Sequence, residues 1–167
     1  MKILGIDPGF RFAGYAVIHN NHSKQYLMDY GCLTLQTKNS LRTRLNAFYD
    51  FFNTKIDEHQ ITHLALETPF LGKNAQNFLK LGYLRGVLLL LSKQKNIELF
   101  ELTPREIKLH ITGYGAASKE QVALALKHLF PSLKALLPMK DDITDAIAIT
   151  VCGMWKNKQS VLSYYSK

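Results

Sequence analysis

Hydrophobic residues in the first third of the chain occur in short runs that turn-forming and polar residues separate, a pattern typical of β-strands. Three strands are expected there, at Ile3–Ile6, Ala13–Ile18 and Tyr26–Leu35. The stretch PGFR separates the first two strands, and the polar stretch HNNHSK separates the second from the third. Connections as short as these join antiparallel neighbours, so the pattern predicts an antiparallel meander.

Beyond residue 40 the hydrophobic period changes to three or four residues, which indicates helices. Helices and strands are then expected in alternation, at Leu41–Ile56, Thr62–Glu67, Asn74–Lys95 and Ile97–Leu102. Ser40 is a suitable N-cap for the first of these helices. The alternation, following three strands, predicts an α/β protein with a mixed sheet.

Helical signals fill the remainder of the chain. Pro104 suits the first turn of a helix that Gly113 ends, and Ser118 begins the next helix with a capping box. A last helix is expected over Asp141–Trp155. No repeat or linker interrupts the chain, so residues 1–167 are expected to form a single domain.

The chain is basic, with 21 lysines and arginines against 13 aspartates and glutamates, a formal net charge of +8 and a pI of about 9.5. A surplus of this size favours a polyanionic partner, most often nucleic acid, although many basic proteins have no such role. Cys32 and Cys152 lack the spacing of metal ligands and are expected to be reduced. No export leader is visible, and the longest apolar run, Gly86–Leu91, is too short to span a bilayer. The cytoplasm is therefore the expected location, without membrane contact.

Four carboxylates stand where a predicted element begins or ends. Asp7 ends the first strand and Glu67 the fourth, whereas Asp142 and Asp145 lie three residues apart on one face of the last helix. If the two strands are neighbours and the helix packs over their ends, the four carboxylates converge. Such a group needs a cation, and oxygen ligands without His or Cys favour Mg²⁺ or Mn²⁺. Two such ions about 3.5–4 Å apart promote phosphodiester hydrolysis.

Each carboxylate also has a purely structural explanation. Asp7 precedes Pro-Gly and suits a turn, and Glu67 can cap a strand end or form an ion pair. Asp142 lies close enough to a helix start to cap it or complement its dipole, as does its neighbour Asp141. Asp145 is harder to explain this way, because an unpaired carboxylate is disfavoured close to the buried side of a helix. The residues by themselves leave both interpretations open.

Several motifs follow one another in an order that resembles a known family. They are GIDPG with GYAVI, ALETPF with KNA and LKLG, GYGAASKEQV, and DDITDAIAI. In this combination, over residues 3–150, the chain resembles the RuvC family of Holliday-junction resolvases. The resemblance implies a ribonuclease-H-like α/β fold, with a five-stranded mixed sheet flanked by helices. It also implies an endodeoxyribonuclease that resolves four-way DNA junctions by paired symmetric nicks in homologous recombination and DNA repair.

Carried over by motif, the resemblance makes Asp7, Glu67, Asp142 and Asp145 the catalytic and metal-binding residues. It implies two Mg²⁺ ions in each active site, for which Mn²⁺ substitutes. A water molecule activated by the metal is then expected to attack phosphorus directly, without a covalent intermediate.

Aromatic and basic residues are expected to bind the DNA. Phe70 matches a family residue that stacks on bases near the junction centre. Lys108 and Lys119 match basic residues that the family places near the cleaved strand. Taken alone, Phe70 also suits a partly buried loop aromatic, and the two lysines are more simply solvated helix residues, as most such lysines are. Further residues after Phe70 are expected to extend the binding surface, namely Lys73, Asn74, Lys80 and Arg85.

The family acts as a homodimer, and the helix predicted at Asn74–Lys95 corresponds to its dimer element. The residues themselves show an apolar stripe with Gly82 and Gly86 four positions apart, which the core of a monomer can also use. The expected partners are four-way junction DNA, a second copy of the chain and a RuvA–RuvB-type branch-migration complex.

Three other functions share some of these sequence features with junction resolution. A related ribonuclease-H-like nuclease acting on RNA–DNA hybrid or RNA would need the same acids, and only the basic loop after Glu67 and the need for two sites favour junctions. An actin-like ATPase shares a turn of the GIDPG type, but it needs a duplicated domain for which 167 residues leave no room. A non-catalytic junction-binding protein would have no use for four acids, which repel phosphate unless a metal intervenes.

Overall fold

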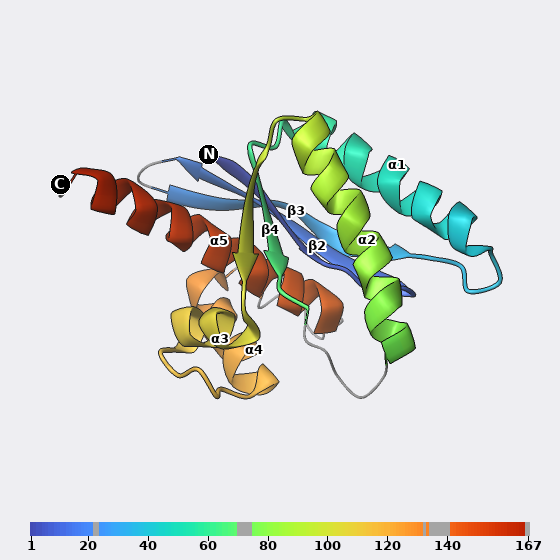
Figure 1. Ribbon diagram of the computed structural model, residues 1–167. Coiled ribbons are helices and arrows are strands. Elements are labelled where there is room, and N and C mark those ends of the chain that lie inside the picture. Colours follow the sequence, from blue (N-terminus) through green and yellow to red (C-terminus); the bar gives the residue numbers. More distant parts are fainter. Residues whose placement is uncertain (22–23, 70–74, 132, 134–140, 166–167) are drawn as a thin grey trace.

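The computed structural model describes residues 1–21, 24–69, 75–131, 133 and 141–165. Within them a five-stranded sheet has the strand order β3-β2-β1-β4-β5 (Figure 1). The strands are β1 (Lys2–Asp7), β2 (Phe12–Asn21), β3 (Lys24–Thr34), β4 (His63–Glu67) and β5 (Glu98–Leu102). The helices are α1 (Leu41–His59), α2 (Ala75–Gln94), α3 (Pro104–Thr112), α4 (Lys119–Leu129) and α5 (Asp141–Tyr165).

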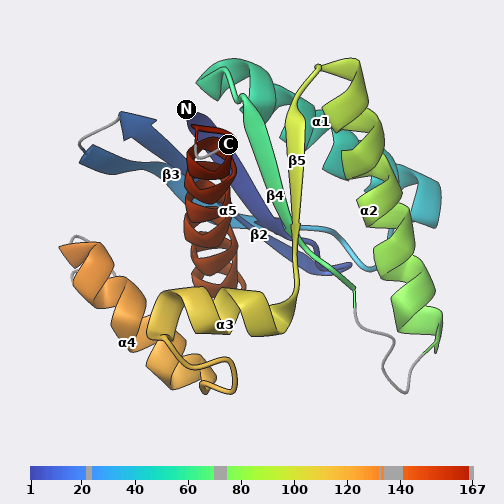
Figure 2. The same cartoon turned by 60° about the vertical axis from the view of Figure 1, so that its left-hand side comes forward.

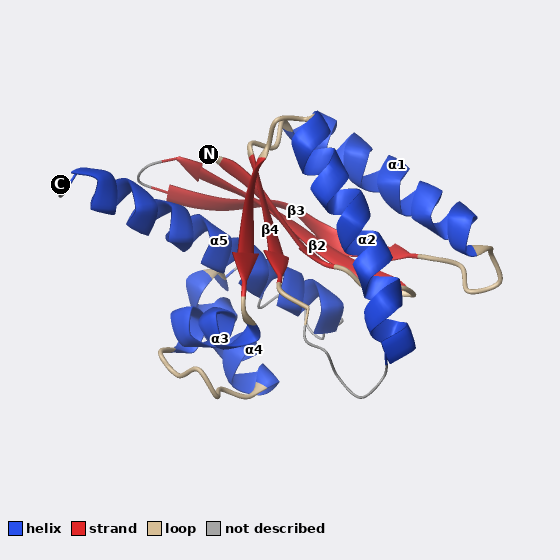
Figure 3. Cartoon of the chain, viewed as in Figure 1, coloured by secondary structure: helices blue, strands red, loops and turns tan. Residues whose placement is uncertain are grey.

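The sheet is mixed, as the alternation of elements predicted. β1, β2 and β3 form the expected antiparallel meander. On its other side β1 pairs in parallel with β4, which in turn pairs in parallel with β5. The parallel β1–β4 register sets Leu4 opposite Leu64 and Ile6 opposite Leu66. Because parallel strands end at the same edge, the carboxyl ends of β1, β4 and β5 point the same way (Figure 3).

The predicted boundaries were too short at several places. β2 reaches Asn21 and β3 begins at Lys24, so most of the HNNHSK stretch belongs to strands and not to a loop. Those hairpin ends are only partly covered, and a strand exposed on both faces carries no alternating pattern. Likewise α1 runs to His59, where Gln60 ends it in a left-handed conformation, and α5 continues past Trp155 to Tyr165. In both helices the apolar period ends before the helical hydrogen bonds do.

Helices cover both faces of the sheet (Figures 1 and 2). On one face α1 and α2 bury Phe48, Phe52 and Leu88 against Leu4 and Ile6 of β1. On the other face α5 packs across β1 and β2, and α3 and α4 pack against α5. Alternate residues of a strand point to opposite faces, so the even-numbered positions of β1 face α1 and α2 and the odd-numbered ones face α5.

Local capping agrees with the sequence. Ser40 accepts a hydrogen bond from the Thr43 N–H at the start of α1, and Ser118 forms the predicted capping box with Gln121 at α4. Gly113 ends α3 in the left-handed region, at a φ of 77°. In the described part of the chain, no helix combines the length and the apolar character that a membrane crossing would require.

Candidate active site

β1 and β4 each end in a carboxylate, and the sheet places both on one face. Asp7 follows Ile3 on the odd-numbered side of β1, and Glu67 follows Ala65 on the odd-numbered side of β4, the sides that α5 covers. The strands are parallel neighbours, so their carboxyl ends meet at one edge of the sheet. The expected adjacency of the first and fourth strands is therefore observed.

Two glycines let α5 lie directly on the sheet. A Cβ atom at Gly14 would stand 1.9 Å from the carbonyl oxygen of Asp142, and one at Gly5 would stand 2.1 Å from the hydroxyl oxygen of Thr150. Both distances are far below van der Waals contact, so a larger residue at either position would displace the helix. Gly14 is also the partner of Asp7 in the β1–β2 ladder. This close approach brings the first turn of α5 next to the end of β1.

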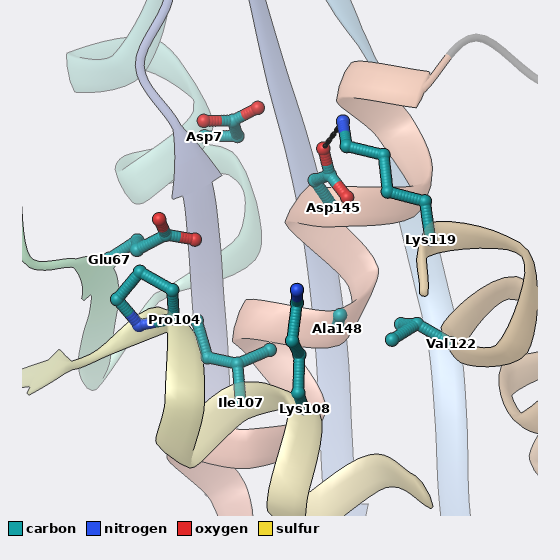
Figure 4. Close-up of a pocket in the computed structure, with 9 residues that line it drawn as sticks. All are labelled: Asp7, Glu67, Pro104, Ile107, Lys108, Lys119, Val122, Asp145 and Ala148. Atoms are coloured by element: carbon teal, nitrogen blue, oxygen red, sulfur yellow. Dashed lines mark hydrogen bonds and ion pairs between the residues drawn. The ribbon is translucent and has the colours of Figure 1, made fainter. Parts of the chain in front are cut away.

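Acidic and basic side chains line a pocket of about 230 Å³ at this edge of the sheet (Figure 4). Asp7 and Glu67 reach it from the two strand ends, and Asp145 reaches it from α5. Lys108 points into the opening from α3, and Lys119 enters from the first turn of α4. Apolar side chains complete the wall, namely Pro104, Ile107, Val122 and Ala148.

The fourth predicted acid, Asp142, lies at the border of this pocket. It stands one helical turn before Asp145, is half-buried, and is not among the lining residues. Its charge is nevertheless close enough to raise the pKa of Asp7. The structure thus gathers three of the four acids around one space and sets the fourth beside it.

Burial and the charges of neighbouring acids oppose ionisation of Asp7 and Glu67. Burial, followed by the charges of the other three acids, raises the pKa of Asp7 from 3.8 to about 7, while Lys119 opposes the rise. Burial and then Asp145 also raise the pKa of Glu67, against the charges of Lys119 and Lys108. Carboxylates that are this reluctant to ionise need an additional cation before all of them carry charge.

Lys119 forms an ion pair across the pocket. Its Nζ lies 3.0 Å from Oδ2 of Asp145, and this contact raises the pKa of Lys119. A lysine in the first turn of a helix opposes the helix dipole, so its position is locally unfavourable. The contact with Asp145 offsets that cost in this structure.

Oxygen donors without imidazole or thiolate suit a hard divalent cation. Across the described ranges, however, no three carboxylate, imidazole or thiolate side chains lie close enough together to coordinate one ion as they stand. The acids therefore fit such an ion chemically, whereas in this structure one oxygen of Asp145 pairs with Lys119.

The remaining predicted DNA-binding residues have different outcomes. Phe70, Lys73 and Asn74 lie outside the described residues, and Lys80 is exposed on α2. The expectation that Arg85 belongs to the binding surface was wrong, because its side chain is buried between α2 and the sheet. An arginine in an amphipathic helix is usually exposed, so the sequence carried no signal of its burial.

The apolar wall of the pocket was also not predicted. Ile107 and Val122 follow the same helical period as the core residues of α3 and α4. Periodicity identifies an inward face, but it does not distinguish a pocket wall from a packed core.

The order of the strands and the helices on both faces define the ribonuclease-H-like class that the motifs implied. Among solved structures, T. thermophilus RuvC in complex with Holliday junction substrate has a TM-score of 0.88 at 21% identity, covering 96% of both chains. The yeast mitochondrial Holliday junction resolvase Ydc2 has a TM-score of 0.69 at 18% identity, covering 98% of this chain and 80% of the other. At these identities the likeness concerns the fold, which confirms the predicted fold class.

Sequence comparison identifies the family. A family model described as crossover junction endodeoxyribonuclease RuvC matches residues 3–153. The protein of that name from Finegoldia magna is 35% identical over 98% of both chains. Its counterpart from Prosthecochloris aestuarii is 38% identical, over 92% of this chain and 81% of the relative. The chain belongs to the RuvC family, as its motifs indicated.

Proposed function

We propose that this chain is a metal-dependent endonuclease that resolves four-way (Holliday) DNA junctions by paired symmetric nicks, in homologous recombination and DNA repair. The observation that carries the proposal is the meeting of Asp7, Glu67 and Asp145, from three separate elements, in one pocket beside Lys108 and Lys119. Membership of the RuvC family supports DNA as the substrate, because its members are named crossover junction endodeoxyribonucleases. The formal net charge of +8 supports a polyanionic substrate independently.

Asp7, Glu67, Asp142 and Asp145 are the residues that would hold the metal, with two Mg²⁺ ions in each site and Mn²⁺ as a substitute. When bound, such ions lower the pKa of water and stabilise negative charge on the phosphate that undergoes hydrolysis. Opening of the Lys119–Asp145 ion pair frees a carboxylate and an ammonium group together. The carboxylate then becomes available to a cation and the ammonium group to a phosphate oxygen.

Lys108 and Lys119 would hold the phosphate of the cleaved strand, since both amines reach the pocket that the acids line. The apolar wall excludes water from one side of this space and strengthens the charge–charge interactions within it. Phe70 would stack on bases near the junction centre, and Lys73 would extend the contact surface. The resemblance to the family implies 5′-phosphate and 3′-hydroxyl ends, which suit ligation and require the bond between phosphorus and the 3′ oxygen to break.

We also propose that the chain acts as a homodimer through α2. The stripe Leu84, Leu88 and Leu91 is buried in the core of the chain itself. The other side of the helix exposes large apolar residues, namely Leu79, Tyr83, Leu89 and Leu90. On that side a Cβ atom at Gly82 or Gly86 would meet nothing within 4 Å. Glycines that the folded chain does not itself require, among exposed apolar residues, suit the close approach of a second copy.

A two-fold symmetric dimer would present two identical sites to the two like strands of a junction. The RuvA–RuvB-type partner, the cytoplasmic location and the single-domain organisation stay predictions from the sequence.

The test compares wild type with Glu67→Gln on a labelled, branch-mobile four-way junction, in Mg²⁺ and in EDTA. Duplex DNA, single-stranded DNA and RNA–DNA hybrid are the competing substrates. We expect paired, Mg²⁺-dependent nicks only in the junction and only by wild type, while both proteins bind the junction in EDTA. Glu98→Gln is the matched control, because Glu98 is exposed on β5 and pairs with His63 outside the pocket.

Other outcomes have defined meanings. Cleavage of the hybrid in place of the junction would move the activity to the ribonuclease alternative. Binding without cutting in Mg²⁺ and in Mn²⁺ would mean that the four acids are turn and capping residues.

A further inference from the structure

Arg85 is a buried cation of α2 that the proposed reaction does not use. The residue is only 8% exposed, and burial of a guanidinium is costly unless its N–H groups are paired. Its Nη1 donates a hydrogen bond to the backbone carbonyl oxygen of Glu67 at 2.6 Å. Its Nη2 pairs with the carboxylate of Glu101 on β5. One side chain therefore connects α2 to the ends of β4 and β5.

Arg85 approaches Glu67 from the face of the sheet that α2 covers. α2 covers the face opposite to α5, whereas the side chain of Glu67 points into the pocket on the α5 face. Arg85 is not among the residues that line the pocket. It therefore acts on the backbone of Glu67 while the carboxylate of Glu67 faces the other way.

The contact between Arg85 and Glu67 lies at the end of β4, where the strand is hydrogen-bonded to β5 but no longer to β1. β4 pairs with β1 only as far as Leu66, so Glu67 lies beyond that ladder. On the β5 side the Thr68 N–H donates to the carbonyl oxygen of Leu102 at 2.7 Å. The Glu67 carbonyl and the Thr68 N–H belong to the same peptide group. That group is thus held at its N–H end by β5 and at its carbonyl end by Arg85.

We propose that Arg85 is a positioning residue that fixes the peptide group after Glu67 and thereby aims the Glu67 carboxylate into the active site. Holding this peptide group restricts ψ of Glu67, which sets the direction of its side chain relative to Asp7 and Asp145. This inference rests on the proposed function, because precise placement of the Glu67 carboxylate matters only if Glu67 is one of the metal-binding acids.

The choice of arginine follows from geometry. A planar guanidinium offers N–H groups in a fixed fork and can serve two acceptors that lie in different directions. A lysine ammonium carries the same charge at a single point, so it can satisfy Glu101 or the Glu67 carbonyl but does not reproduce the fork. Arg85 also lies one helical turn after Gly82. The same helix therefore carries both the proposed dimer face and the side chain that contacts the backbone of Glu67.

The experiment uses Arg85→Lys, with Lys95→Met as the matched control. Lys95 follows α2 and pairs with Asp57 of α1 at 2.8 Å, so its loss breaks an ion pair beside the same helix without touching β4. Each protein is measured for single-turnover junction cleavage at saturating enzyme, for junction affinity in EDTA, for Mn²⁺ binding by electron paramagnetic resonance, and for thermal unfolding.

We expect Arg85→Lys to slow the single-turnover step by roughly 10- to 100-fold, the range for a small displacement of a catalytic group. We also expect it to weaken Mn²⁺ binding and to leave junction affinity in EDTA unchanged. Lys95→Met is expected to change none of these properties. In Glu101→Gln the guanidinium keeps its Glu67 contact but loses its charged partner, so the rate should fall in the same direction and by less.

Failure of this inference differs from failure of the proposed function. If wild type does not cut junctions, the proposed function is wrong whatever Arg85 does. If wild type cuts and folded Arg85→Lys cuts equally fast and binds Mn²⁺ equally well, the positioning role is overturned. A parallel fall in junction affinity and rate would likewise overturn it, because that pattern indicates general loss of structure. If Arg85→Lys does not fold, Glu101→Gln decides by the same criteria.

Discussion

Removing the charge of Asp7 should stabilise the metal-free protein while it abolishes cutting. The pKa of Asp7 is raised from 3.8 to about 7, first by burial and then by the neighbouring acids. In the unfolded chain the same carboxyl has its ordinary pKa, so the folded state holds this proton more tightly. The contribution of this group to stability is therefore greatest below about pH 4 and falls as the pH rises toward 7.

The magnitude follows from the two pKa values. At about 1.4 kcal/mol for each pH unit, the difference between 3.8 and about 7 corresponds to at most ~4 kcal/mol of destabilisation at pH 8. An asparagine removes the buried charge and its repulsion by the other acids, but its buried amide loses hydration, which costs ~1–3 kcal/mol. We therefore expect Asp7→Asn to raise the free energy of unfolding by about 1–3 kcal/mol at pH 8 in EDTA.

Urea denaturation of wild type and Asp7→Asn measures this difference. At pH 5 the advantage of Asp7→Asn should shrink, because Asp7 of folded wild type is then mostly protonated and neutral. Mg²⁺ at pH 8 should stabilise wild type more than the variant, since an ion that binds only the folded state adds to its stability. Asp50→Asn, on an exposed part of α1, is the control and should show no gain at either pH.

Two results would refute the reasoning. Equal stability of wild type and Asp7→Asn at pH 8 in EDTA would mean that burial and the neighbouring acids do not disfavour the charge of Asp7 in the folded chain. A gain that is as large at pH 5 as at pH 8 would mean that it does not come from ionisation of Asp7.

Three further changes test other parts of the structure. Gly14→Ala places a Cβ 1.9 Å from the Asp142 carbonyl oxygen, so it should lower the free energy of unfolding by about 1–3 kcal/mol or more and abolish cutting; normal stability in urea would contradict the close contact of α5. Lys119→Met should slow single-turnover cutting by about 10²–10³-fold. It should also move the rising limb of the pH–rate profile to higher pH, because Lys119 lowers the pKa values of Asp7 and Glu67; an unmoved profile would speak against that coupling. Leu90→Glu introduces a charge at a position that is 53% exposed on the proposed dimer face, so sedimentation should change from dimer to monomer; a wild type that is itself monomeric would rule out the dimer.

Much of the fold could be predicted because its signals are local. The apolar runs that end in Asp7 and Glu67 marked two strands, and Gly113 and Ser118 marked helix boundaries correctly. The strand ends beside the hairpin and the end of α5 were missed, because polar segments at the border of a sheet or along an extended helix carry no apolar period. The polarity of Asn21 is an example, since it belongs to β2 all the same.

Sequence alone determined which residues are proposed to carry the chemistry. Four acids at element boundaries, a basic composition and an ordered set of motifs indicated the nuclease family, and each of these signals depends on residue identity and short-range spacing. Because alternate residues of a strand point to opposite faces, Asp7 is predicted to lie on the same face as Ile3, once the face that Ile3 occupies is known.

Only the tertiary structure decided how those residues meet. It placed Asp145 in the pocket and paired it with Lys119, kept Asp142 at the border, and turned Arg85 inward to the backbone of Glu67. These outcomes depend on contacts between segments that are far apart in the chain. The burial of a charged group is decided by the partners that such segments supply, and local backbone preference carries no information about them.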